Sequence, residues 1–184
     1  YSFKSFKEQE ETIKNLITND ILLLAVYAPI VEEVLKFGAA YFSALRRKEN
    51  DEPIDPTIYL ITSALGFAAL VNVLFLVNPL SESNIITSIA TGDLRFIGAS
   101  LLHIIASASI GIFIGFAFYK RRILKFILTV VGLITAITLH SFFNFFIISG
   151  TERNIFTVFS VLWFAVIALM LILEKIKKVK IKSE

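Results

Sequence analysis

Residues 21–45 of this 184-residue chain read ILLLAVYAPIVEEVLKFGAAYFSAL. It is long enough to cross a bilayer as a helix, which needs about 20 consecutive apolar residues. Three charged residues interrupt it: Glu32, Glu33 and Lys36. A charge at the centre of a membrane helix costs about 2.5 to 3.5 kcal/mol on the insertion scale, so these three residues are expected to be functional or paired.

The three charges lie close together on a helix. Lys36 falls roughly 40° around the axis from Glu32 and 60° from Glu33, so it can hold at least one carboxylate ionised. A self-neutralising structural trio is one interpretation. Two carboxylates for one lysine, however, leave a surplus charge that structure alone does not require. Pro29 lies one turn before Glu33, and we expect the helix to bend there because proline removes a backbone donor.

The rest of the chain extends this membrane pattern. Hydrophobic residues make up 56% of the sequence and charged residues 18%, which is too apolar for an ordinary water-soluble domain. Cysteine is absent, which excludes disulfides, thiolate metal sites and a cysteine nucleophile. Runs long enough to span the hydrocarbon core, without the strict alternation of barrel strands, occupy residues 21–45, 57–77, 94–119, 123–149 and 155–173.

The predicted fold class is therefore all-α, a polytopic helical membrane protein of about five transmembrane helices. We expect an N-terminal interfacial amphipathic helix over residues 1–19, a bundle over 20–174 and a basic cytoplasmic tail over 175–184. The chain begins at Tyr1 and its one methionine is Met170, so a further span upstream is left open.

The basic residues predict the orientation. They cluster at 46–48, 120–125 and 175–182, whereas the predicted loop over 78–93 has none. The first three regions should be cytoplasmic and the last should face outward. A lysine run directly after a span is more simply an anchor to anionic lipid than a nucleic-acid site, so the lipid bilayer is an expected partner and nucleic acid is not.

Hydrogen-bonding side chains recur inside four of the predicted spans. Asn72, His103, His140 and Asn144 join Glu32 at 6 to 12 residues from the outer boundaries. At about 1.5 Å per residue they share one layer, roughly 9 to 18 Å below the outer surface. A lone histidine in a span is more often a packing residue than a catalyst. The common depth instead favours a water-filled cavity that opens outward.

A ridge of mostly small residues runs along the third predicted span, with members every four residues. Such a ridge lets a neighbouring helix approach closely, and we interpret the two glycines as packing residues. The ridge consists of Ala99, His103, Ser107, Gly111 and Gly115.

The polar layer excludes several protease chemistries. Aspartate occurs only at 20, 51, 55 and 93, outside the span interiors, so a two-aspartate protease is excluded, and no His-Glu-x-x-His sequence exists. Gly98-Ala99-Ser100 is similar to the serine motif of rhomboid proteases, but Ser100 lies in a continuous helical pattern and Leu101 replaces the following glycine. A glutamate and a histidine that activate water remain, with a second histidine and an asparagine able to donate to an oxyanion.

Four segments in order resemble the motifs of the PrsW family, membrane-embedded glutamic proteases related to the CAAX prenyl endopeptidases. The resemblance covers about two thirds of the chain, and Lys36, three residues after the second glutamate, favours PrsW over the prenyl branch. One departure is Val71-Asn72, where the family motif reads Glu-Asn. The matching segments are Ala28–Lys36, Gly66–Asn72, Arg95–His103 and His140–Asn144.

The resemblance implies that Glu32 and His103 activate the attacking water, that His140 and Asn144 bind the oxyanion, and that Glu33 supports them. It implies no cofactor and no metal. It also implies a single-span, anti-sigma-factor-like substrate cut on the outer side of the plasma membrane of a prokaryotic cell. The alternatives are an inactive scaffold and a proton or ion carrier, and Val71 favours the inactive form. The candidate catalytic residues are Glu32, Glu33, His103, His140 and Asn144, with Lys36, Asn72 and Arg95 in supporting roles.

Overall fold

The computed structural model describes residues 23–77, 85–148 and 152–179, and within these ranges all regular structure is helical. This confirms the all-α fold class. The predicted interfacial helix over residues 1–19 lies outside the described residues, as does the end of the basic tail beyond residue 179.

The first predicted span is helical from Leu23 to Leu45 but is not one regular helix. A π-helical turn, η1 (Leu23–Tyr27), precedes α2 (Ala28–Ala40), and a second, η2 (Tyr41–Leu45), follows it. Pro29 stands at the start of α2, directly after the first wide turn. Proline lacks the backbone N–H of a regular turn, which explains why the irregularity occurs at the expected place.

Four longer helices follow. They are α3 (Asp55–Val77), α4 (Ile85–Phe116), α5 (Arg122–Ile148) and α6 (Glu152–Ile176). Each contains a segment long and apolar enough to cross a membrane: Asp55–Leu74, Phe96–Phe116, Arg122–Phe146 and Thr157–Ile176. The 23–45 segment differs from these four because its regular helix has 13 residues and three of them are charged. The described part of the chain is thus a polytopic helical membrane protein.

The start of α4 departs from the prediction. The loop expected over 78–93 extends at most to residue 84, because α4 already begins at Ile85. The prediction ended the loop at the charged residue Asp93. A helix satisfies its own backbone hydrogen bonds in water as well as in lipid, so a charge marks the edge of the apolar segment and not the end of the helix.

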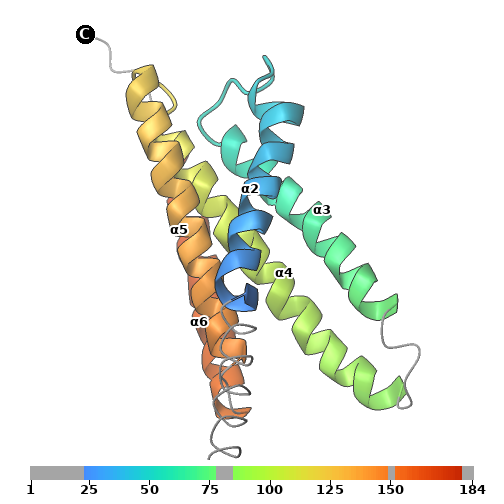
Figure 1. Cartoon of the computed structure of the whole chain (residues 1–184). Coiled ribbons are helices and arrows are strands. Elements are labelled where there is room, and N and C mark those ends of the chain that lie inside the picture. Colours follow the sequence, from blue (N-terminus) through green and yellow to red (C-terminus); the bar gives the residue numbers. More distant parts are fainter. Residues whose placement is uncertain (1–22, 78–84, 149–151, 180–184) are drawn as a thin grey trace, which may run out of the picture.

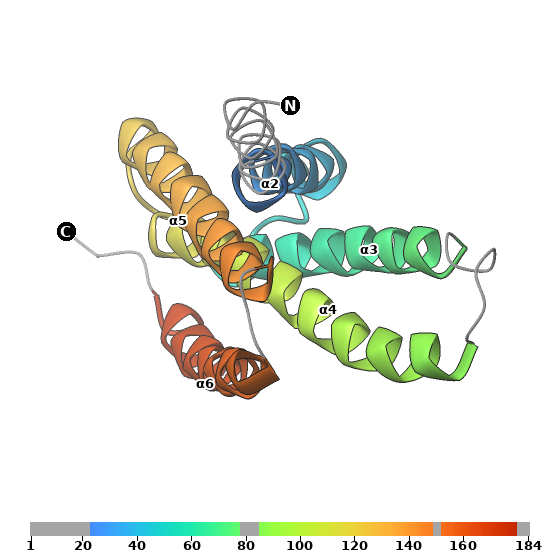
Figure 2. The same cartoon turned by 60° about the horizontal axis from the view of Figure 1, so that its bottom comes forward.

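Helix α4 is the centre of the bundle. It packs against α3 and α5, and α6 also contacts it. Figure 2 shows α2 and α6 on opposite sides of the α4–α5 pair. In Figure 1 the connections α2–α3 and α4–α5 and the end of α6 lie at the same end of the bundle. These are the three regions in which the basic residues cluster.

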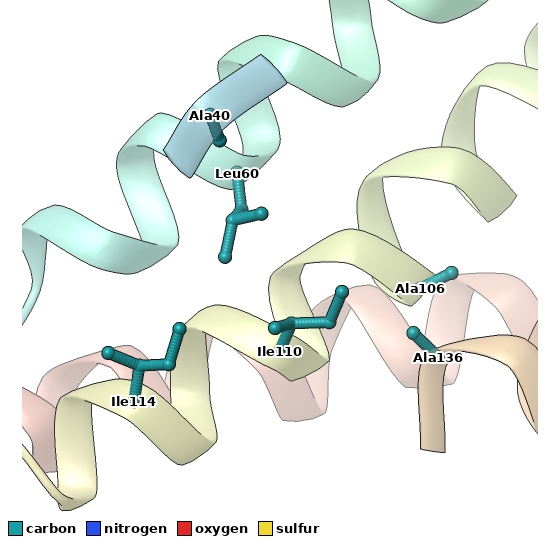
Figure 3. Packing of buried hydrophobic residues seen from close by; sticks show 6 residues of the cluster. All are labelled: Ala40, Leu60, Ala106, Ile110, Ile114 and Ala136. Atoms are coloured by element: carbon teal, nitrogen blue, oxygen red, sulfur yellow. The ribbon is translucent and has the colours of Figure 1, made fainter. Parts of the chain in front are cut away.

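The core where the helices meet is built from small and branched side chains contributed by four helices (Figure 3). Leu60 of α3 points toward Ile110 and Ile114 of α4, and Ala40 and Ala136 complete the cluster from α2 and α5 together with Ala106. Small residues let the helix axes approach without loss of packing.

Gly111 and Gly115 are packing residues, as predicted. A Cβ atom at Gly111 would lie 2.8 Å from the backbone nitrogen of Thr57, and one at Gly115 would meet the carbonyl oxygen of Pro53. No other residue fits at that distance, so these glycines fix how closely α4 approaches the start of α3.

The outer surface is apolar and the interior holds charges. Large side chains such as Phe42, Phe126, Phe164 and Met170 are exposed, whereas Glu33 and Lys36 are buried. This is the reverse of a water-soluble protein, and it is the distribution expected of helices that present their outer faces to lipid.

Candidate active site

The polar side chains from three helices meet in one buried cluster. Helix α2 contributes Glu32, Glu33 and Lys36, α4 contributes His103, and α5 contributes His140. The two imidazole rings meet edge to face with their centroids 4.9 Å apart. Of the side chains that the sequence placed in one layer, Glu32, His103 and His140 therefore lie close together.

Glu33 is the fully enclosed carboxylate of the cluster. Its side chain has 0% exposure, and Oε1 accepts hydrogen bonds from Lys36 Nζ and from His140 Nδ1, the latter at 2.8 Å. Its other oxygen, Oε2, accepts a hydrogen bond from Ser107 Oγ at 2.9 Å. A buried carboxylate is tolerated when it is paired and when both oxygens are hydrogen-bonded, and Glu33 meets both conditions.

Glu32 has the opposite environment. Its side chain retains 26% of its exposure, and Oε2 lies 3.6 Å from His140 Nε2 and 3.9 Å from His103 Nδ1. Both distances are too long for direct hydrogen bonds, and among the described residues Oε2 has no hydrogen-bond partner. This oxygen can accept a hydrogen bond from a water molecule or a substrate group between the two rings.

The partners of the two rings define which nitrogen carries a proton. A carboxylate only accepts, so His140 Nδ1 is a donor to Glu33 and its Nε2 faces Glu32. Lys36 Nζ lies 3.1 Å from His103 Nδ1, and an ammonium group only donates, so this nitrogen accepts. Neutral His103 consequently carries its proton on Nε2.

Phe67 of α3 forms an apolar wall beside this cluster. Lys36 Nζ lies 5.1 Å from the centre of the Phe67 ring, and the ring meets His103 edge to face at 5.3 Å. An aromatic face stabilises a nearby cation and excludes water from it. In the sequence, Phe67 stands out only as part of the Gly66–Asn72 motif, because a phenylalanine in an apolar helix does not by itself indicate a functional site.

The remaining candidates are Asn72, Asn144 and Arg95. Asn72 of α3 donates to Ser100 Oγ at 3.3 Å, so its partner is the serine three residues before His103. Asn144 is half-buried one turn beyond His140 on α5. Arg95 belongs to α4, but its side chain lies outside the described residues.

The fold and the cluster together define a class, namely helical membrane proteins that hold carboxylates and imidazoles together between their apolar helices. The comparison with protein families is more specific. A family model described as PrsW family intramembrane metalloprotease matches residues 5–172, and the chain belongs to this family.

One curated relative and the solved structures complete the comparison. The chain is similar to the protein named Protease PrsW from Geobacillus kaustophilus (strain HTA426), with 32% identity over 95 residues. The match covers 52% of this chain and 37% of the relative's length. No solved structure matches the chain significantly.

The family's description raises the question of a metal ion. One ligand atom from each of Glu32, His103 and His140 lies within 4.8 Å of the other two, and two histidines with one glutamate form a known catalytic zinc set. Oε2 of Glu32, which has no hydrogen-bond partner in the described part of the chain, also fits this set. Glu33 fits too, because a carboxylate that accepts from Nδ1 of a histidine orients a ligating imidazole. These residues could hold a divalent cation, although Lys36 already occupies His103 Nδ1. The metal-free site stays a prediction.

Proposed function

We propose that this chain is an intramembrane peptidase of the glutamic type, which hydrolyses a peptide bond of a membrane protein with a water activated by Glu32. One observation carries the proposal. Among the described residues, the buried oxygen Oε2 of Glu32 has no hydrogen-bond partner, and it lies beside two imidazoles that other helices hold in place, while the Glu32 side chain as a whole is partly exposed. A general base that takes a proton from water needs a lone pair that can accept the proton and neighbouring groups held in a fixed position around it.

In the proposed reaction a water molecule donates a proton to Glu32 Oε2. The oxygen of this water then attacks the carbonyl carbon of the substrate. The C–N bond then breaks, and the proton held by Glu32 passes to the leaving nitrogen. His103 helps to position the water. His140 Nε2, when protonated, and Asn144 donate to the oxyanion, as the resemblance implies. Glu33 stabilises that charge on His140 through its contact with Nδ1.

A divalent cation, if bound, would be held by Glu32, His103 and His140. Such an ion lowers the pKa of a bound water and polarises a carbonyl group. In that case Glu33 keeps its contact with His140 Nδ1, because Glu33 is not among the three candidate ligands.

The proposed substrate is a single-span, anti-sigma-factor-like membrane protein cut on the outer side of a prokaryotic plasma membrane. The position of the cluster within the apolar helices supports a substrate that itself enters the bilayer. The partial exposure of the Glu32 side chain supports access of the substrate's backbone to the site.

The test uses the purified chain in lipid nanodiscs and a panel of fluorescently labelled single-span peptides. Glu32→Gln keeps the size of the side chain but removes its basicity, so we expect cleavage to slow by about 10²-fold or more. Glu174→Gln is the matched control, because Glu174 is exposed at the end of α6 and pairs only with Lys177 among the described residues. Cleavage by the wild type and the control but not by Glu32→Gln supports the proposal. Equal cleavage by all three overturns it.

Chelation tests the glutamic class separately. We expect the cleavage rate to be unchanged after dialysis against EDTA. A rate that falls on chelation and returns with added zinc would contradict the glutamic class and make Glu32, His103 and His140 the metal ligands.

A further inference from the structure

Ser107 makes a contact that packing does not require. It lies on α4 four residues after His103, and its side chain is fully buried. Its sequence position identifies it only as a member of the small-residue ridge. Its hydroxyl group nevertheless donates a hydrogen bond to another helix, to Oε2 of Glu33 on α2, at 2.9 Å.

The direction of this hydrogen bond is unusual for a serine in a helix. Such a hydroxyl commonly bonds to a carbonyl of its own helix one turn earlier. Ser109 does so on the same helix, donating to the carbonyl of Ala106 at 2.6 Å, and Ser43 donates to that of Ala39. Ser107 instead supplies the donor that Glu33 Oε2 needs.

The effect on Glu33 follows from its geometry. A carboxylate group rotates about its terminal bond, and this torsion has only a broad preference of its own. Bonds to Lys36 and His140 occupy Oε1, and the Ser107 bond occupies Oε2, so the plane of the group is fixed from both sides. Oε1 is then held where His140 Nδ1 can donate to it.

We propose that Ser107 is a positioning residue of the active site, which holds Glu33 so that Glu33 in turn orients the His140 ring toward Glu32. This inference rests on the proposed peptidase function for its kinetic consequence. The orientation of the ring is a property of the resting protein and can be measured without a substrate. For comparison, groups that orient a metal-ligating imidazole typically change metal affinity or activity by about 10- to 100-fold when removed.

The first test is spectroscopic. The chain has two histidines, so ¹⁵N-histidine labelling gives NMR signals from two rings only, which His103→Ala assigns. In the wild type we expect the Nδ1 proton of His140 to appear far downfield and to exchange slowly, because Glu33 accepts it. In Ser107→Ala we expect this signal to broaden or vanish at the same pH. In Ser109→Ala, which removes an equally small buried hydroxyl from the same helix, we expect it to persist.

The second test is kinetic and uses a single-span peptide that the wild type cleaves. Ser107→Ala should lower kcat about tenfold with KM within twofold, Ser107→Thr should recover most of the rate because it keeps the hydroxyl, and Ser109→Ala should match the wild type. Circular dichroism and melting temperature verify that each variant is folded.

The two tests separate the possible failures. A His140 signal that is unchanged in folded Ser107→Ala overturns the positioning role, whatever the activity. Equal losses in Ser107→Ala and Ser109→Ala overturn it too, since they would show a general effect of buried hydroxyl groups. Loss of the signal in Ser107→Ala alone, in a protein that cleaves none of the peptides, supports the positioning role and counts against the peptidase function.

Discussion

At the scale of single residues, two adjacent glutamates have different environments. Glu33 is closed to solvent, and both of its oxygens are hydrogen-bonded, to Lys36, His140 and Ser107. Glu32, one residue earlier, is partly exposed and its Oε2 has no described partner. Successive residues on a helix point about 100° apart, so one carboxylate can be structural while its neighbour is left to react.

A substitution at Val71 can test the role of the glutamate that the PrsW motif has at this position. Val71 is half-buried on α3 and precedes Asn72, whose amide bonds to Ser100. We expect Val71→Glu to raise the cleavage rate while lowering the melting temperature, because a carboxylate in an apolar setting costs a few kcal/mol unless it is wetted or protonated. Both quantities are measured on the same preparation. A lower melting temperature with an equal or lower rate would show that the position serves packing alone.

The contacts of single residues were only partly predictable from the sequence. Helical angles placed Lys36 near both carboxylates, and counting from the span ends placed His103 and His140 at the depth of Glu32. Neither argument fixes how each helix is rotated about its axis. It was therefore not predictable that Lys36 and His140 would share Oε1 of Glu33, or that Ser107 would donate to Oε2. A serine in a ridge of small residues looks like packing until the opposing helix is known.

At the scale of elements, the sequence predicts the helices. It predicts only some of their irregular turns and ends. The spans now assigned to α3, α5 and α6 were recognised because their apolar runs are long and their flanks are charged. Pro29 indicated an irregularity in the first segment. The second π-helical turn at Tyr41–Leu45 has no comparable signal in the sequence. The start of α4 at Ile85 is not predictable from the charge at Asp93, because a charged residue marks the edge of the apolar segment and not the end of the helix.

The contact between α3 and α4 gives a prediction at this scale. Gly111→Ala places a methyl group 2.8 Å from the Thr57 backbone nitrogen, so the two helices must separate, and we expect a loss of about 1 to 3 kcal/mol in stability. Thermal unfolding in detergent, followed by circular dichroism, measures the change.

The matched control is Gly38→Ala on α2, where an added Cβ has no neighbour within 4 Å. That substitution should leave the melting temperature unchanged or raise it slightly, because alanine favours a helix over glycine. Equal melting temperatures for Gly111→Ala and the wild type would mean that the close approach of α3 and α4 does not limit stability.

At the scale of the whole molecule, charge and apolar surface together indicate how the bundle sits in a membrane. The three basic regions lie at one end of the bundle, and large apolar side chains cover its outside. Lysine and arginine are retained on the cytoplasmic side of a membrane, so this end should face the cytoplasm and the other should face outward.

Single cysteines test this orientation cleanly because the natural chain has none. Glu49→Cys lies in the α2–α3 connection, and Asn84→Cys lies between α3 and α4 in the sequence. In intact cells, an impermeant maleimide should label Asn84→Cys, whereas Glu49→Cys should react only after the cells are opened. Labelling of both from the same side would contradict the outward orientation of the site.

We propose that Glu32 and the two histidines act as one catalytic unit, and a double-mutant comparison of cleavage rates tests this claim. The rates of Glu32→Gln, His140→Ala and the double variant are measured on one single-span peptide against the wild type. Residues that act as a unit give strongly non-additive losses, so we predict that the double variant is about as slow as the slower single variant. Single variants that cleave at the wild-type rate, or losses that simply multiply in the double variant, would contradict the claim.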